Sequence, residues 1–376
     1  MRLRRPRGVV CYWHDGEFVA HPYPGGGPTA LHPVVAEVLT AFDDWVEPSK
    51  AAELLDHLTP DTFAAAVDAL REVGLLLTED TPEAERDAHV HRAWGSWAPE
   101  APFFHYATQD MVRADHDDDS HQADVPREPL PSMFTGYPDA DRVLLPRRPV
   151  DLAARYDHVL YRRRTHRDFT DDPVPLDTLA ALLATTFGPV DYIDCGVGAL
   201  YRRTSPAGGS RQELEGYLAI RDVTGVAPGL YHYNALEHSL ELLAGGFTAE
   251  EGTRMGADQD WVGRAPFLVV LTAVIDRMYS KYRTPRCYRV SLLNAGHLGQ
   301  TFVLTATALG LGPAQTGAFR DTLVATRFGL DNVGHTPLYL LAAGWPHPEP
   351  RRVPPVAGLE TFRRNRLPAE PPLTGR

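Results

Sequence analysis

The sequence has little lysine, little cysteine and no long apolar run. Of its 37 basic residues only Lys50 and Lys281 are lysines, so the chain relies on arginine, which keeps its proton in proteins. Its 3 cysteines form no CxxC pair, which argues against a disulfide framework and a structural zinc site. No apolar run approaches the ~20 residues of a membrane helix, and the apolar stretch near the basic N-terminus is too short for a signal peptide. We therefore expect a soluble, cytoplasmic protein without a membrane partner.

Acidic residues outnumber basic ones, and the common phosphate-binding motifs are missing. The formal net charge of −12 makes nonspecific nucleic-acid binding unfavourable. No GxGxxG follows a strand and no GxxxxGK[ST] occurs, so neither a Rossmann site nor a P-loop is indicated. The run DHDDDSH at 115–121 is more often a solvated loop than a metal site. We expect no metal and no nucleic-acid partner.

Residues 1–90 have the pattern of a small helical unit with a hairpin. Asp15-Gly16 is a turn pair suited to positive φ and joins two β-rich runs. Three short helices follow, the last with Thr59 as its N-cap and Gly74 as its stop, and then a strand. This order predicts a winged helix-turn-helix domain. With 7 basic against 16 acidic residues it lacks the basic face of a DNA reader. Peptide binding by strand addition and a purely structural role both remain open.

Residues 91–145 show little periodicity, whereas residues 146–376 alternate between helical and strand patterns. The aromatic stretch 94–108 is too apolar for a free linker, so we expect 91–145 to be a linker that packs on the second, catalytic domain. In 146–376 there are short strands, a strand apolar on both faces at 265–275 and a long buried helix at 288–312. The pattern predicts an α+β domain.

Two segments of the second domain suit an anionic, flat ligand. The run YRRRTHRDF at 161–169 places several donors at one helix end, where they are able to converge on one phosphate. These donors are Arg163, Arg164, Thr165 and Arg167. The glycine-rich run SPAGGSRQELEGYL at 205–218 allows backbone N–H groups to approach a flat ligand closely. Taken alone, the arginine run is equally typical of exposed surface.

Six motifs occur in a fixed order: RRTHRDF, PAGGSRQELEGYL, GLYHYN with HSLELLAG, KYRTPRCYRVSLLNAGHLGQ, ALGLGPAQTGAF and PLYLLAAG. In this order they resemble the flavin-dependent nitroreductase family, over about residues 145–376. Within that family the chain is similar to the SagB-type peptide dehydrogenases, the azoline oxidases of ribosomal peptide biosynthesis. The acidic N-terminal unit resembles the precursor-peptide recognition element that often accompanies such enzymes.

The resemblance implies a non-covalently bound FMN at the interface of a homodimer, in a fold with a mixed sheet flanked by helices. It assigns the FMN phosphate and ribityl chain to Arg163, Arg164, Thr165 and Arg167. It assigns the surroundings of the isoalloxazine to Pro206, Gly208, Gly209, Thr316, Gly317 and Ala318. A second phosphate contact would come from Arg351 or Arg352. The chain departs from the family's usual residue at Ala207 (serine), Glu213 (proline), Asn294 (glutamate) and Thr301 (asparagine).

The resemblance also implies a catalytic base. In SagB-like enzymes a Lys-Tyr pair before the long helix fills that role, and here the pair is Lys281-Tyr282. An amine accepts a proton only when neutral, which requires a lowered pKa from burial or a nearby cation. A surface lysine beside a packing tyrosine is the alternative. His297 and Tyr288 are secondary candidates, since a histidine in a long apolar helix is more often a core residue.

Three functions agree with these features. The first is an FMN-dependent dehydrogenase that oxidises an azoline of a modified peptide, with O2 as acceptor and the leader peptide bound by residues 1–90. The second is an NAD(P)H-dependent flavin reductase of a nitroaromatic, a quinone or a dehydroamino acid. The third is a non-catalytic leader-binding partner in a synthetase complex. A cyclodehydratase or another modifying enzyme is a further expected partner.

Overall fold

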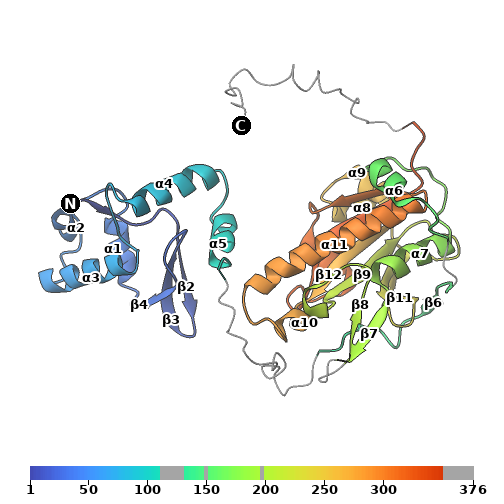
Figure 1. Cartoon of the computed structure of the whole chain (residues 1–376), viewed down its shortest axis with the longest axis horizontal. Coiled ribbons are helices and arrows are strands. Elements are labelled where there is room, and N and C mark those ends of the chain that lie inside the picture. The colour runs from blue at the N-terminus through green and yellow to red at the C-terminus, as the bar shows by residue number, and fades with distance from the viewer. Residues whose placement is uncertain (111–130, 148–150, 195–198, 350–376) are drawn as a thin grey trace. The chain divides into compact units, whose positions relative to one another are not determined.

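The computed structural model describes residues 1–110, 131–147, 151–194 and 199–349. The chain divides into two compact units, Met1–Asp115 and His116–Arg376 (Figure 1). Within the described ranges, no helix combines the length and the apolar character that a membrane span needs.

The first unit combines short helices with two small antiparallel sheets. Its elements are β1 (Leu3–Arg4), β2 (Val9–His14), β3 (Glu17–Pro22), β4 (Thr29–Leu31), α1 (Val35–Ala41), α2 (Pro48–Ala52), α3 (Pro60–Glu72), β5 (Leu77–Thr78), α4 (Pro82–Trp94) and α5 (Glu100–Ala107). The predicted hairpin is present as β2 and β3, with positive φ at Asp15 and Gly16. Thr59 caps α3 by accepting from the Thr62 amide. The winged helix-turn-helix stays a prediction.

The aromatic stretch packs on the hairpin of the first unit. Phe103 of α5 has ring contacts with Tyr12, His21 and Tyr23, at centroid distances of 6.5, 5.1 and 6.0 Å. The chain turns after α4 and lays the apolar face of α5 on the hairpin. Residues 132–145 do lie on the second unit, where Phe134 stacks on Tyr201 at 4.6 Å. The expectation that residues 91–145 are a linker that packs on the catalytic domain stays a prediction.

The second unit is built on a seven-stranded sheet with strand order β13-β14-β12-β9-β10-β11-β6. The strands of this sheet are β6 (Arg142–Leu144), β9 (Leu214–Ile220), β10 (Gly229–Asn234), β11 (Ser239–Gly245), β12 (Phe267–Val274), β13 (Gly312–Thr316) and β14 (His335–Gly344). A separate hairpin joins β7 (Asp191–Asp194) and β8 (Ala199–Arg202). The helices are α6 (Tyr156–Arg162), α7 (Leu176–Phe187), α8 (Ala249–Met255), α9 (Asp260–Arg264), α10 (Ile275–Tyr279), α11 (Arg286–Ala308) and α12 (Asp321–Phe328).

Every pairing in this sheet is antiparallel among the described strands, so the prediction of a mixed sheet is wrong. The crossover through α10 and α11 does join two strands of the same direction, β12 and β13. These two are not neighbours, because β14 inserts between them and runs antiparallel to both.

Helices cover both faces of the sheet, because its central strands are apolar on both sides. On β9, Leu218 and Ile220 belong to the core with α7 and α11. Their neighbours Tyr217 and Ala219 belong to the core with α8, α9 and α12. This alternation is the period of two expected along a strand. Figure 1 shows α11 lying across one face of the sheet, with α10 near one end and α6 near the other.

Candidate functional site

The arginine run follows directly on α6, whose helix ends at Arg162. Arg163 is half-buried, and the side chains of Arg164, Thr165 and Arg167 are exposed. The run is fixed to β13, because the His166 amide donates to the Pro313 carbonyl at 2.9 Å. This places three guanidinium groups within five residues at the start of β13.

The positive charge of this run is left without acidic partners. Among the described residues, no carboxylate forms an ion pair with Arg163, Arg164 or Arg167. The Arg167 guanidinium lies over the Trp261 ring, 5.9 Å from its centroid. Burial, and then the charges of Arg163 and Arg164, lower the pKa of His166. The arrangement is that of an anion-binding surface.

The glycine-rich run forms a tight turn between β8 and β9. Gly209 has a φ of 60°, a conformation that glycine adopts without strain. The next amide, of Ser210, donates to the Ala207 carbonyl at 3.1 Å, and that of Arg211 donates to the Gly208 carbonyl. The turn is therefore held from within, and it presents backbone rather than side chains to its neighbours.

Lys281 and Tyr282 lie directly on this turn. A methyl group at Gly209 would lie 2.6 Å from the Tyr282 Oη and 3.1 Å from the Lys281 Nζ. Only a glycine leaves both polar atoms this close to the backbone. Lys281 is exposed, Tyr282 is half-buried, and the Lys281 Nζ is 5.3 Å from the Tyr282 ring centroid. Two segments separated by some seventy positions in the sequence thus meet at one point.

Three of the four positions that depart from the family's pattern make hydrogen bonds at the glycine turn or beside it. Asn294 on α11 accepts from the Gly208 amide at 3.3 Å and donates to the Glu213 Oε1 at 2.8 Å. The Thr301 hydroxyl is 2.5 Å from that of Ser205, just before the turn. The family usually has glutamate on the helix and proline in the loop. In this chain the loop carries the carboxylate of Glu213, and the helix carries the amide of Asn294. The exchange keeps a polar link between α11 and the turn.

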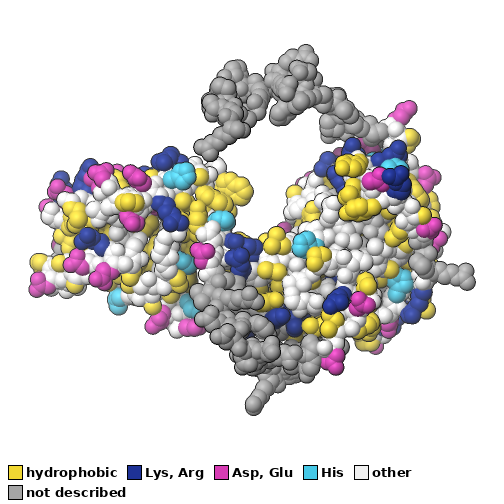
Figure 2. Space-filling model, in the orientation of Figure 1, with side chains coloured by type: hydrophobic (Ala, Val, Ile, Leu, Met, Phe, Trp, Pro, Cys, Tyr) yellow, Lys and Arg dark blue, Asp and Glu magenta, His cyan; other side chains and the backbone are white. Residues whose placement is uncertain are grey.

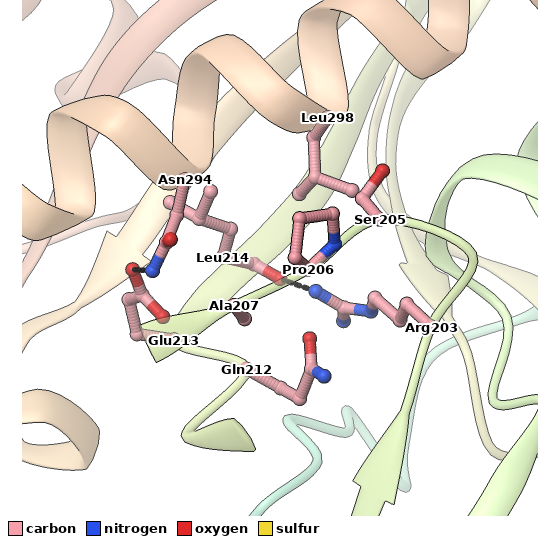
Figure 3. A pocket seen from close by; sticks show the side chains of 9 residues that line it. All are labelled: Arg203, Ser205, Pro206, Ala207, Gln212, Glu213, Leu214, Asn294 and Leu298. Carbon is pink, nitrogen blue, oxygen red and sulfur yellow. Dashed lines mark hydrogen bonds between the residues drawn. The ribbon is translucent and has the colours of Figure 1, made fainter. Parts of the chain in front are cut away.

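Glu213 is fully buried, and its second oxygen, Oε2, has no hydrogen-bond partner among the described residues. Figure 3 shows its carboxylate below Asn294, at the edge of a small cavity behind the turn. Pro206, Ala207 and Arg203 also line this cavity. His297, expected in the core, is exposed instead, and its Nδ1–H donates to the Pro206 carbonyl at 3.3 Å.

The late glycine segment follows β13. Thr316 accepts from the Ala318 amide at 3.0 Å, and Gln259 donates to the Ala318 carbonyl at 2.6 Å. A side chain at Gly317 would meet no described atom within 4 Å, so this position is open. Arg351 and Arg352 lie outside the described residues, as do Cys195 and the run 115–121.

Helix α11 separates the two groups of predicted site residues. Gly208 lies beside Val290 in its first turns, and the His166 ring lies against Gly312, just beyond its end. At 1.5 Å per residue, the 18 residues from Val290 to Ala308 span about 27 Å. The arginine run and the Lys281-Tyr282 pair are therefore at opposite ends of the helix within one chain.

A buried charged network behind the turn was not predicted from the sequence. Arg277 on α10, four residues before Lys281, pairs with Glu215 on β9, and His232 lies between Glu215 and Glu241. Its one signal was the position of Glu215 in the glycine-rich motif PAGGSRQELEGYL, which carries part of the resemblance. No cluster of three metal-ligating side chains occurs in the described parts of the chain, and burial raises the pKa of the Cys287 thiol.

Known proteins and one family model are similar to the second unit. Residues 160–345 match the model of the nitroreductase family. A protein of Methanocaldococcus jannaschii named as a nitroreductase is 29% identical over 190 residues, which are 50% of this chain and 90% of that protein. The trifolitoxin-processing protein TfxB of Rhizobium leguminosarum bv. trifolii is 25% identical over 310 residues, 75% of this chain and 79% of its own length.

Among solved structures, a protein of Anabaena variabilis described as a nitroreductase has a TM-score of 0.53 and 24% identity. The match covers 65% of this chain and 47% of that one, so this chain spans about half of its length. This likeness shows a common fold. Residues 160–345 of the second unit are therefore similar to the nitroreductase family.

Proposed function

We propose that this chain is an FMN-dependent dehydrogenase of a ribosomally made, modified peptide. The reaction would convert an azoline to an azole by removing one proton and one hydride, and O2 would take up the two electrons. The observation that carries the proposal is the contact of Lys281 and Tyr282 with the glycine turn. A proton acceptor at a site where backbone is exposed to a flat ligand is the arrangement that such an oxidation needs.

Two separate groups of described residues fit an FMN, one its phosphate and the other its ring system. The unpaired guanidinium groups of Arg163, Arg164 and Arg167 suit a terminal phosphate. The open position at Gly317 leaves room for the edge or face of an aromatic ring system, and the turn at Gly209 would supply backbone groups beside it. When bound, FMN would supply the two-electron acceptor. The chain's own residues would bind the phosphate, orient the ring and take the proton.

The separation along α11 supports a site shared by two chains. One FMN does not span about 27 Å of helix, so the arginine run of one protomer and the glycine turn of another would complete each site. The surface carries exposed apolar side chains on the same elements, namely Tyr161 on α6 and Leu292 and Leu293 on α11. Figure 2 shows hydrophobic patches on this unit. We propose that these faces form a homodimer.

The amine of Lys281 would take the proton from the ring carbon of the azoline. The side chain reaches the turn, where the Tyr282 hydroxyl is close enough to orient either the amine or the substrate. The first unit would bind the leader of the precursor peptide and so raise the local concentration of the ring near the turn. The similarity to a trifolitoxin-processing protein supports a peptide substrate.

The test uses two samples of the purified protein. The flavin is released from one sample and identified, and the other sample, as holoprotein, is mixed anaerobically with azoline-bearing precursor peptide. We expect about one FMN per chain, bleaching of the flavin by peptide, and a loss of about 2 Da per oxidised ring. Bleaching by NAD(P)H but not by any peptide would support a reductase and contradict the proposal. A protein that holds no flavin would point to the non-catalytic partner.

A further inference from the structure

Arg277 is the centre of a buried network next to the proposed site. It is 2% exposed and makes contacts with three separate segments. Its Nη1 lies 2.5 Å from the Glu215 Oε1 and 3.2 Å from the Gln212 carbonyl. Its Nε donates to the Ser132 carbonyl at 2.7 Å, and its Nη2 donates to the Thr135 hydroxyl at 3.2 Å. One side chain thus joins α10, the end of the glycine turn and the segment that leads into the second unit.

The network continues behind Arg277 through buried charges. The second oxygen of Glu215 accepts from His232 at 3.2 Å, and the other ring nitrogen of His232 is 2.8 Å from Glu241. Burial alone would raise the pKa of Glu215, but the His232 hydrogen bond and the Arg277 charge lower it to about 2. Glu215, His232 and Glu241 are each at most 3% exposed. The Arg277 guanidinium is therefore held against buried charged groups whose positions are fixed by their own hydrogen bonds.

Arg277 lies on α10, the helix that leads directly to Lys281. Helix α10 ends at Tyr279, and the amides of both Lys281 and Tyr282 donate to the carbonyl of Met278, at 3.1 and 2.9 Å. The pair is thus the direct continuation of the helix that Arg277 anchors. The same guanidinium fixes Gln212, three residues after Gly209. Both partners of the contact between Lys281 and Gly209 are therefore tied to one buried side chain.

We infer that Arg277, backed by Glu215, His232 and Glu241, is a positioning residue that holds Lys281 and Tyr282 against the glycine turn. The inference rests on the proposed function for its catalytic meaning. A buried ionic network contributes little net stability compared with an apolar core, yet it fixes geometry. Misplacement of a reacting group by about 1 Å from a change elsewhere is able to cost 10²-fold in rate.

The scarcity of lysine makes a direct test possible. Reductive methylation with ¹³C-formaldehyde labels Lys50, Lys281 and the N-terminal amine, and a Lys50→Arg variant assigns the signals. Lys50 lies in the first unit and serves as an internal reference. The experiment uses the full-length holoprotein and compares wild type with Arg277→Met, Glu215→Gln and Thr135→Val. Arg203→Met is the matched control.

Arg203 is 8% exposed and is bonded to the Phe187 and Leu214 carbonyls and the Tyr201 hydroxyl. It is therefore a buried arginine of the same unit whose hydrogen bonds to described residues do not reach α10. If Arg277 acts only through general stability, both arginine variants should affect Lys281 alike once compared at equal fraction folded.

We expect the rate of Lys281 labelling relative to Lys50 to rise at least about threefold in Arg277→Met and Glu215→Gln, and less in Thr135→Val. Flavin bleaching by peptide should slow by about 10²-fold in Arg277→Met, with the half-saturating peptide concentration little changed. An unchanged Lys281 signal in the network variants, or an equal change in Arg203→Met, would overturn the inference. If Arg277→Met does not fold, the other two variants decide it. If peptide fails to bleach even the wild type, the proposed function fails and the labelling result still judges the positioning role.

Discussion

Arginines lie near both ends of helix α11, but their surroundings differ. Near its C-terminal end the arginines of 163–167 are largely exposed and have no acidic partners among the described residues. Near its N-terminal end Arg277 is buried and bonded to four groups. Unpaired arginines are available to an external anion, whereas a fully bonded arginine is available only to hold its surroundings. The contrast predicts that substitutions in the arginine run alter FMN binding. Substitutions around Arg277 and Lys281 should instead alter the rate of the chemical step.

The largest expected effect is at the turn. Lys281→Ala should lower the rate of flavin bleaching by peptide by about 10² to 10⁴, the usual contribution of a general base, and should leave the flavin content unchanged. Lys281→Arg should be nearly as damaging, because a guanidinium keeps the charge but accepts no proton. Wild-type rates in both variants would show that the base lies elsewhere, and Tyr282 would be the next residue to test.

At the other end the effect should be on occupancy. Each charge-assisted hydrogen bond is worth about 1.5 kcal/mol or more, so Arg163→Ala with Arg167→Ala should weaken FMN binding by about 10²-fold or more. The double variant should purify largely as apoprotein, as judged by the ratio of flavin to protein absorbance. Arg221→Ala, on the same unit but bonded to the Ala265 and Arg264 carbonyls, is the control. Full flavin occupancy in the double variant would remove the phosphate assignment.

The turn end should also show a pH-dependent stability that the exposed arginine run lacks. Burial alone would lower the pKa of His232, but its hydrogen bonds to Glu215 and Glu241 raise it. Its contribution is therefore complete below the unfolded value of about 6.5 and is lost as pH rises through the folded-state pKa. Glu215, with a pKa of about 2, contributes above its ordinary value and loses that contribution as pH falls towards 2.

His232→Gln should therefore lower the free energy of unfolding most near pH 5 to 6.5, by about 1.5–3 kcal/mol, and less as the solution becomes alkaline. Urea denaturation of wild type and variant at pH 6 and pH 9 measures this. A difference that stayed constant or grew with pH would mean that His232 is neutral in the folded protein.

The smallest effect concerns the exchange between Glu213 and Asn294. Glu213→Pro leaves the Asn294 amide without its acceptor, and Asn294→Glu places two carboxylates side by side. The double variant restores the family's usual pair, so the two changes should couple by about 1 kcal/mol in the free energy of unfolding. Strict additivity in a denaturation cycle would show that the two positions are independent.

The sequence predicted the parts of this site better than their arrangement. The Asp15-Gly16 hairpin and the N-cap at Thr59 follow from local backbone preferences, and both are present. The resemblance drew attention to Gly209 and Lys281, and the structure brings them together. Their spacing in the sequence does not predict this contact, because it depends on how α10 leaves β12 and meets the turn before β9.

Other features depend on long-range packing and were missed. The Arg277–Glu215–His232–Glu241 network joins α10 to three consecutive strands, β9, β10 and β11, that lie well before it in the sequence. The ring contacts of Phe103 with the hairpin of the first unit were also missed, because an apolar helix face does not indicate which surface it will cover. The sheet was expected to be mixed, and the insertion of β14 between β12 and β13 has no local signature.

The central claim is that the arginine run of one chain and the glycine turn of another complete one site. Co-expression of an Arg163→Ala/Arg167→Ala chain with a Lys281→Ala chain tests it directly, with peptide-driven flavin bleaching as the readout. In a mixed dimer both lesions fall in one shared site and the other site is intact. Random pairing should then restore roughly a quarter of the wild-type active sites, since half of the dimers are mixed and each has one intact site. If each site belongs to a single chain, every site keeps a lesion, and the mixture will be no more active than the separate variants.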